Sequence, residues 1–357
     1  TLNRTDDRTR DARNTGPWLV CLVGAESVAC ARPATSDGFS FRLSDLLGGV
    51  AGAVMTANSP QSMAVLAEPY LTDYQVDSLT HAVQETGIDI PLVVVNETSG
   101  EGYDPDDVAA AVNNPIGLST LRLFADVFSR ERWWSFVIAE RKIAEELGLS
   151  NTAERRIHVD DVPVFDDAAV HHVDPIQDGS WNRLPQETVE EVTDRADVVV
   201  RYGFGLIEGD ILTAPRDGVL SFHPADIRRY RGLGPPQAYV DGRTTIGISL
   251  QRLSDGIDDG EIVAIEQQDI GDCDTLWDIY DRLRTVQRRL LTTGILDLRD
   301  PDFEPLRPDS VGPYYSITAR REPGFAFTVL RKNLQGYVTR ARADFRKGIV
   351  SDSTYTD

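Results

Sequence analysis

The sequence predicts an α/β fold with a mostly parallel, twisted sheet, and two observations lead to that prediction. Apolar runs at 63–68 and 91–97 enclose a segment with helical spacing, which is a β-α-β order. Both runs are almost continuously apolar, as is typical of parallel strands that are buried on both faces. We therefore expect helices on both sides of the sheet.

The first predicted helix, between these two strands, has signals at both ends. Thr72 or Asp73 can cap its start, and Gly87 can end it. Val76 and Leu79 are spaced so that they share one face of the helix. This face is expected to pack on the sheet.

A second helix is predicted at 130–148, after a Gly-, Asp- and Pro-rich loop at 99–116. Phe136, Ile143 and Leu147 keep helical spacing within it. Because these are large apolar side chains on one stripe, we expect them to face the core.

The segment 158–187 is predicted to be irregular, because Asp, Pro and three histidines break every apolar pattern in it. His171 and His172 are adjacent, which can suggest a metal ligand pair. No further ligands follow at the spacing of a tetrahedral site, so we predict a solvated loop and no metal.

The remainder of the chain completes the sheet and its cover. We expect a capped helix at 184–195, a strand at 196–207, a short helix and strand leading to His223, two strands within 244–270, a helix from Leu276 and a last helix at 325–347. The chain is accordingly divided into a partly disordered N-terminal extension at 1–60, an α/β domain at 61–275 and a helical C-terminal region at 276–357.

The charge pattern indicates adaptation to concentrated salt. The 357 residues have a formal charge of −21, and the only lysines are Lys142, Lys332 and Lys347. Carboxylates hold water at a protein surface, whereas lysine presents a long apolar stem. We expect a halophilic, haloarchaeal protein. Its charge repels nucleic acid in dilute buffer. In 1 M salt the Debye length is only about 3 Å, so this repulsion is screened, and a nucleic-acid partner is disfavoured without being excluded.

Cysteine and hydropathy patterns predict a cytoplasmic protein. Cys21, Cys30 and Cys273 are odd in number and form no C-x-x-C pair, which argues against a disulfide framework or a zinc ribbon. The apolar run at 17–31 has the outline of a secretory signal, but acidic residues interrupt both the run and its leader. The run at 46–55 is too short to span a bilayer, so we expect no transmembrane segment. The oligomeric state is left open.

Residues that can perform chemistry follow the ends of two predicted strands. Gly203, Phe204 and Gly205 lie where one strand ends, and His223 lies where the next one ends. Ligands of open α/β sheets bind outside the carboxyl ends of the strands. A histidine there can donate to an oxyanion or move a proton near neutral pH. The two strand ends therefore predict one shared site.

A series of motifs follows these strand ends. They are His223-Pro224, Arg231-Gly232, Gly247 and Asp258-Asp259-Gly260. In order and spacing they resemble the catalytic domain of the folate-dependent formyltransferases, the family of methionyl-tRNA formyltransferase and glycinamide ribonucleotide formyltransferase. The family pattern has Asn-x-His-Pro, an Arg-Gly turn, a strand with glycine and an Asp-x-Gly turn. The chain departs from it at Ser221, where the family has its catalytic asparagine.

The resemblance implies a Rossmann-like formyltransferase fold and 10-formyltetrahydrofolate as co-substrate, without a metal. It implies that His223 is the general acid/base and oxyanion donor and that Asp258 is its partner. Ser221 would replace the asparagine amide that holds the formyl oxygen. A serine hydroxyl can also donate, but the loss of one such donor can cost about 10²–10³ in rate.

Two sets of binding residues also follow from the resemblance. Glycines at a strand end let backbone groups approach a planar pterin ring closely. The expected contacts of the formyl donor are Phe204, Gly205, Leu206 and Asp258. The expected contacts of the acceptor are Arg231 and Gly232.

Other basic residues keep two interpretations. Arg228 and Arg229 could bind an acceptor phosphate, but in so acidic a chain we expect them to pair with surface carboxylates. The basic helix at 325–347 could contact a phosphate-bearing acceptor or an anionic membrane, or could simply pack with its arginines solvated.

We expect an N-formyltransferase that acts on a primary amine, with a small molecule or amino sugar favoured over initiator tRNA. We expect the residues after the helix from Leu276 to be too few for the β-barrel domain that the resemblance to methionyl-tRNA formyltransferases would imply. Two alternatives stay open. One is hydrolysis of the formyl donor, and the other is a non-catalytic folate-binding protein, which Ser221 would support.

Overall fold

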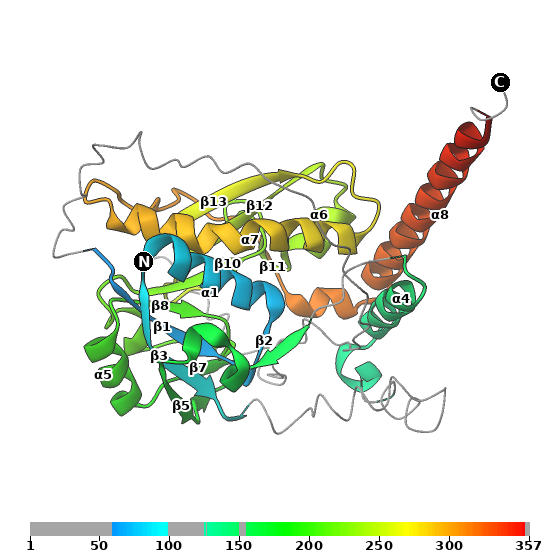
Figure 1. Cartoon of the computed structure of the whole chain (residues 1–357). Coiled ribbons are helices and arrows are strands. Elements are labelled where there is room, and N and C mark those ends of the chain that lie inside the picture. Colours follow the sequence, from blue (N-terminus) through cyan, green and yellow to red (C-terminus); the bar gives the residue numbers. More distant parts are fainter. Residues whose placement is uncertain (1–58, 99–124, 126, 150–154, 354–357) are drawn as a thin grey trace, which may run out of the picture.

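The computed structural model describes residues 59–98, 125, 127–149 and 155–353 (Figure 1). The expected extension at 1–60 lies outside the described residues except for its last two positions. The same holds for the loop expected at 99–116. The side chains of 344 and 346–353 are also outside the described part.

A seven-stranded sheet forms the centre of the protein, in the order β13-β12-β10-β8-β1-β3-β5. The five strands from β10 to β5 are parallel, and β12 and β13 form an antiparallel hairpin at one edge. This confirms the predicted α/β class with a mostly parallel sheet. The strands are β1 (Ser62–Ala67), β3 (Asp89–Asn96), β5 (Ala169–Val173), β8 (Val198–Arg201), β10 (Val219–His223), β12 (Thr245–Arg252) and β13 (Glu261–Asp269).

Helices cover both faces of the sheet (Figure 1). Helices α1 (Asp73–Thr86) and α7 (Leu276–Arg299) lie side by side on one face, and α5 (Gln186–Arg195) covers the other. The strands are apolar on both faces because alternate residues enter different layers: Val65 packs under α1 and α7, and Leu66 packs under α5. A contact of 2.6 Å between His81 Nδ1 and Thr292 Oγ1 joins α1 to α7.

The two long helices α4 (Trp134–Glu146) and α8 (Pro323–Ser353) pack together beside the sheet (Figure 1). The predicted apolar face of α4 is wrong: Phe136, Ile143 and Leu147 are 37, 59 and 66 % exposed. The buried face includes Trp134 and Val137. The position of α8 selects this face, because Glu140 of α4 accepts hydrogen bonds at 2.9 Å from the Asn333 amide and at 2.6 Å from the Tyr337 hydroxyl of α8.

The prediction of an irregular segment at 158–187 is also wrong. Within it β5 pairs in parallel with β3 and extends the central sheet by one strand. An edge strand is buried less completely than a central one, so β5 keeps polar residues that hide its pattern. His171 in β5 is 43 % exposed in its side chain and pairs with Glu191 of α5 at 2.7 Å.

Short elements complete the described fold. They are β2 (Tyr70–Thr72), β4 (Arg156–His158), β6 (Ile176–Asp178), β7 (Trp181–Arg183), β9 (Leu206–Ile207), β11 (Arg231–Gly232), β14 (Tyr314–Tyr315), α6 (Gly234–Val240), η4 (Val159–Asp161), η5 (Pro163–Phe165), η6 (Asp210–Leu212) and η7 (Ile317–Arg321).

The topology places a switch point at the carboxyl ends of β1 and β8. From β1 the chain adds β3 and β5 on one side, and then crosses to place β8 on the other side. Such a switch point is where ligands of open α/β sheets bind. Gly203 follows β8 so closely against β1 that a Cβ atom there would lie 2.5 Å from the Ala67 carbonyl carbon.

We predict that Gly203→Ala destabilises the protein by about 1–3 kcal/mol. The new methyl group would overlap the backbone of Ala67 and Glu68, which cannot move away as a flexible side chain can. Gly324→Ala is the matched control, since a Cβ atom at 324 in α8 has no heavy atom within 4 Å. That change should be neutral or stabilising by up to about 1 kcal/mol. Denaturant unfolding measures the stability of both variants. Equal unfolding midpoints for the two variants would contradict the close approach of Gly203 to β1.

Candidate active site

A row of polar side chains crosses the face of the sheet that α5 covers elsewhere. In β10, Ser221 and His223 alternate with residues of the opposite layer, and the register pairs them with Gln251 and Ser249 of β12. Arg201 at the end of β8 pairs in register with Ser221. Val199 and Val219, earlier in the same two strands, belong to the apolar layer under α5. The face therefore changes from apolar to polar toward the carboxyl end of the sheet.

His223 is fixed through both ring nitrogens. Its Nδ1 lies 3.2 Å from Oδ1 of Asp258, and its Nε2 lies 2.9 Å from the carbonyl oxygen of Tyr230. Both partners are oxygen acceptors, so a ring with a proton on each nitrogen satisfies both contacts. The residue is only 4 % exposed. In this conformation Nε2 is a proton donor, and it can turn to another acceptor only if the Tyr230 carbonyl moves.

Asp258 brings several segments to one carboxylate. Oδ1 accepts from the Gln251 amide at 3.0 Å, and Oδ2 accepts from the Gly232 backbone N–H at 2.7 Å. Burial raises the pKa of this carboxyl, but His223 and the two hydrogen bonds outweigh it and hold the pKa of Asp258 well below its usual range. Asp258 is therefore an ionised acceptor throughout the neutral range, and it keeps the His223 ring oriented.

The Arg231-Gly232 motif positions the acidic turn. The Arg231 guanidinium donates through Nε and Nη2 to the carbonyl oxygen of Ile257, at 2.9 and 2.6 Å. Gly232 has a φ of 73° in the left-handed region, and a Cβ atom there would lie 2.2 Å from the Tyr315 carbonyl oxygen. Contact of these two residues with an acceptor stays a prediction.

Arg201 is a site residue that sequence reasoning missed. Its Nη2 and Nε lie 2.9 and 3.3 Å from Oγ of Ser221, and its Nη1 donates to the carbonyl oxygen of Gly205. A lone arginine that ends an apolar strand was the available signal, because a buried guanidinium needs several acceptors.

The switch point between β1 and β8 has a second site residue that sequence reasoning missed, Glu68. Its Oε1 accepts from the Phe204 backbone N–H at 2.8 Å, whereas its Oε2 is buried without a hydrogen-bond partner among the described residues. Phe204 has a φ of 66°, and its side chain is fully buried under α5. The Phe204 carbonyl accepts from the Asn182 amide at 2.8 Å. The donor contacts predicted for Phe204, Gly205 and Leu206 stay predictions.

Comparison with known proteins identifies the part of the chain that carries these residues. The family model for formyl transferase matches residues 167–295, which include Arg201, Ser221, His223 and Asp258. This segment is similar to the formyl transferase family.

Relatives match this chain in part. The methionyl-tRNA formyltransferase of Lachnospira eligens is 32 % identical over 151 residues, which are 41 % of this chain and 47 % of that protein. The methionyl-tRNA formyltransferase of Caulobacter vibrioides is 37 % identical over 101 residues, which are 28 % of this chain and 32 % of that protein. The chain thus spans about half the length, or less, of these curated relatives.

Among solved structures, a sugar N-formyltransferase of a Shewanella species aligns with a TM-score of 0.44 and 12 % identity, over 72 % of this chain and 78 % of that one. Because this overall similarity is low, the functional inference rests on the site residues and the family match.

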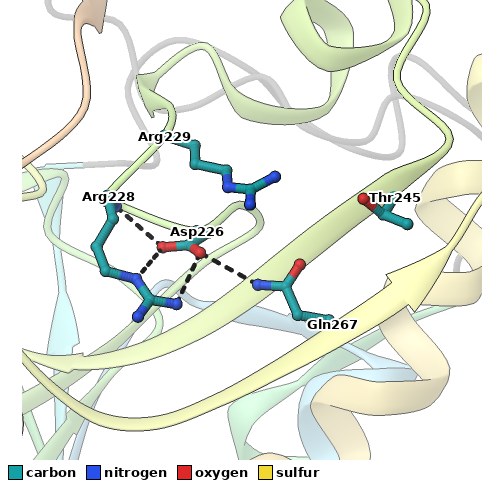
Figure 2. A pocket seen from close by; sticks show the side chains of 5 residues that line it. All are labelled: Asp226, Arg228, Arg229, Thr245 and Gln267. Carbon is teal, nitrogen blue, oxygen red and sulfur yellow. Dashed lines mark hydrogen bonds and ion pairs between the residues drawn. The ribbon is translucent and has the colours of Figure 1, made fainter.

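The matched segment also has an open hollow of about 610 Å³ (Figure 2). Asp226 accepts from Arg228 at 2.9 Å and from the Gln267 amide at 3.1 Å, which confirms the expected carboxylate pairing of Arg228. Within the described part of the chain Arg229 has no such partner, contrary to the expectation. Thr245 of β12 completes the lining of the hollow.

Two features are absent from the part of the chain that the structure describes. No group of three or more His, Cys, Asp or Glu side chains there is placed to hold a metal ion. No helix among the described ranges is both long and apolar enough to cross a membrane.

We predict that Asp258→Asn lowers the free energy of unfolding at pH 7 by about 1–3 kcal/mol, because charged hydrogen bonds are lost. The pKa of Asp258 is lower in the folded than in the unfolded chain, so its stabilisation is present above about pH 3.9 and is lost as the pH falls through the lowered value. The gap between wild type and variant should therefore narrow below about pH 4.

Denaturant unfolding from pH 7 to pH 3 measures this gap. Asp259→Asn is the control, because Asp259 is the exposed neighbour in the same turn. A gap for Asp258→Asn that does not change with pH would contradict the depressed pKa.

Proposed function

We propose that this chain transfers a formyl group from 10-formyltetrahydrofolate to a primary amine. The observation that carries the proposal is the contact of His223 with Asp258 at 3.2 Å inside the segment that matches the formyl transferase model. Nε2 of His223 faces the carbonyl oxygen of Tyr230. As a hydrogen-bond donor, Nε2 is suited to the oxyanion that forms when the formyl carbon becomes tetrahedral.

The proposed reaction has two steps. The amine nitrogen attacks the formyl carbon, a C–N bond forms, and the carbonyl electron pair moves to the oxygen. The pair then returns, the bond from the formyl carbon to N10 breaks, and N10 takes up a proton while the acceptor nitrogen gives one up. The products are a formamide and tetrahydrofolate, and His223 with Asp258 would hold and move the protons.

We propose a small-molecule amine or amino sugar as the acceptor, in preference to initiator tRNA. The chain has a formal charge of −21, which opposes the approach of a polyanion. Oε2 of Glu68 is buried and lacks a hydrogen-bond donor within the described residues, so it could accept from an amine N–H. Initiator tRNA stays the competing acceptor, because the matching relatives are named methionyl-tRNA formyltransferases.

We predict that 10-formyltetrahydrofolate turns over only when an amine is present, and that His223→Ala lowers kcat by about 10²–10⁴. We also propose that the protein is cytoplasmic, haloarchaeal and adapted to concentrated salt. The assay is therefore run in concentrated salt. His171→Ala is the matched control, since His171 lies on the edge strand β5 and pairs with Glu191.

The other outcomes separate the competing functions. Formate release without any amine would identify a hydrolase of the formyl donor. Tight donor binding without turnover by any variant would identify a non-catalytic folate-binding protein. A chain that neither binds nor uses the donor would overturn the proposal, and formylation confined to charged initiator tRNA would overturn the choice of acceptor.

A further inference from the structure

The replacement of the family asparagine by Ser221 is accompanied by an arginine on the neighbouring strand. Strands β8 and β10 are parallel, and their register places Arg201 directly beside Ser221 on the same face of the sheet. Ser221 is 1 % exposed, so its hydroxyl cannot rely on water for hydrogen bonds. Its bonding is therefore determined by the guanidinium.

The contacts with Arg201 leave the Ser221 hydroxyl free to act as a hydrogen-bond donor. A hydroxyl oxygen has two acceptor lone pairs and one O–H donor. Nη2 and Nε of Arg201 both donate to Oγ, at 2.9 and 3.3 Å, and so occupy both acceptor positions. The O–H proton remains available to a further acceptor, and the adjacent positive charge makes it a stronger donor.

The charge on Arg201 persists although its surroundings oppose it. Burial is the largest effect and lowers the pKa of the guanidinium, while the carboxylates of Asp258 and Glu68 raise it. An arginine stays protonated at neutral pH even under such shifts. Because the group is partly removed from water, its field acts on nearby atoms more strongly than that of a surface arginine.

We propose that Arg201, acting through Ser221, stabilises the negative charge that develops on the formyl oxygen, in place of the family's asparagine amide. Arg201 is then a positioning residue and Ser221 the group that touches the reacting oxygen. As the amine attacks, the carbonyl electron pair moves to the oxygen, and the Ser221 O–H donates a hydrogen bond to it without transferring its proton. The bond weakens again when the pair returns and N10 leaves. This inference rests on the proposed function.

The competing explanation is structural. Nη1 of Arg201 also donates to the Gly205 carbonyl in the segment predicted to contact the pterin ring, so Arg201 could serve only to hold that segment. A purely structural role predicts weaker donor binding and a higher KM. A role through Ser221 predicts a lower kcat with little change in the KM for the donor.

The test compares Arg201→Met, Arg201→Lys, Ser221→Ala and the double variant of Arg201→Met with Ser221→Ala. We expect Arg201→Met and Ser221→Ala each to lower kcat by about 10²–10³, with the donor KM within about threefold of wild type. Arg201→Lys keeps the positive charge but loses the paired N–H donors of the guanidinium, so kcat should fall less than in Arg201→Met. The double variant should lose little more than the worse single variant, because the two residues act as one unit.

Arg252→Met is the control for the removal of an arginine from a neighbouring strand, since Arg252 pairs with Glu261 instead of Ser221. Circular dichroism and the affinity for tetrahydrofolate check that each variant is folded. Multiplicative losses in the double variant, a loss confined to KM or to tetrahydrofolate affinity, or full activity of Arg201→Met would overturn the inference. Wild type without any formyl transfer would overturn the proposed function as well, so the two failures are distinguishable.

Discussion

The carboxylate of Asp258 is the contact on which the candidate site depends. It lies 3.2 Å from His223 at the end of β10 and accepts from Gln251 on β12 and from the Gly232 backbone in β11. The carboxylate therefore joins three separate strands to the acidic turn. A buried ionised carboxylate is costly unless its oxygens are bonded, so the same requirement that keeps Asp258 charged also fixes its neighbours.

Side chains of opposite charge lie near one another at the carboxyl end of the sheet. Asp258 lies beside His223, and the guanidinium of Arg201 is influenced by both Asp258 and Glu68. In a water-poor site such fixed charges cost no reorganisation when a substrate acquires charge. Under the proposed function, the guanidinium of Arg201 would supply a polarising charge that Ser221 alone does not have.

Sequence patterns predicted the parts of the fold in which one signal dominates. The strands of the β-α-β unit around α1 are apolar on both faces, and the unit was found with its approximate limits. The strand predicted at 196–207 is divided into β8 and β9. Strand β5 was missed because an edge strand tolerates histidines, and the buried face of α4 was misjudged because α8, almost two hundred residues later, decides it. For the site, the motif order placed His223 near Asp258, but Arg201 and Glu68 depend on strand register, which apolar runs alone do not reveal.

The scattered origin of the site has a consequence for how activity appears during folding. Glu68, Arg201 and His223 stand at or just beyond the ends of β1, β8 and β10, and Asp258 lies in the turn between β12 and β13. The strands β1 and β8 are neighbours in the sheet although β3, β5 and α5 lie between them in the sequence. Contacts between residues so distant in the sequence form late, because the entropy of closing long loops opposes them. Helical signal should therefore return before the polar row is assembled, and recovery of catalysis would report the completion of the whole sheet.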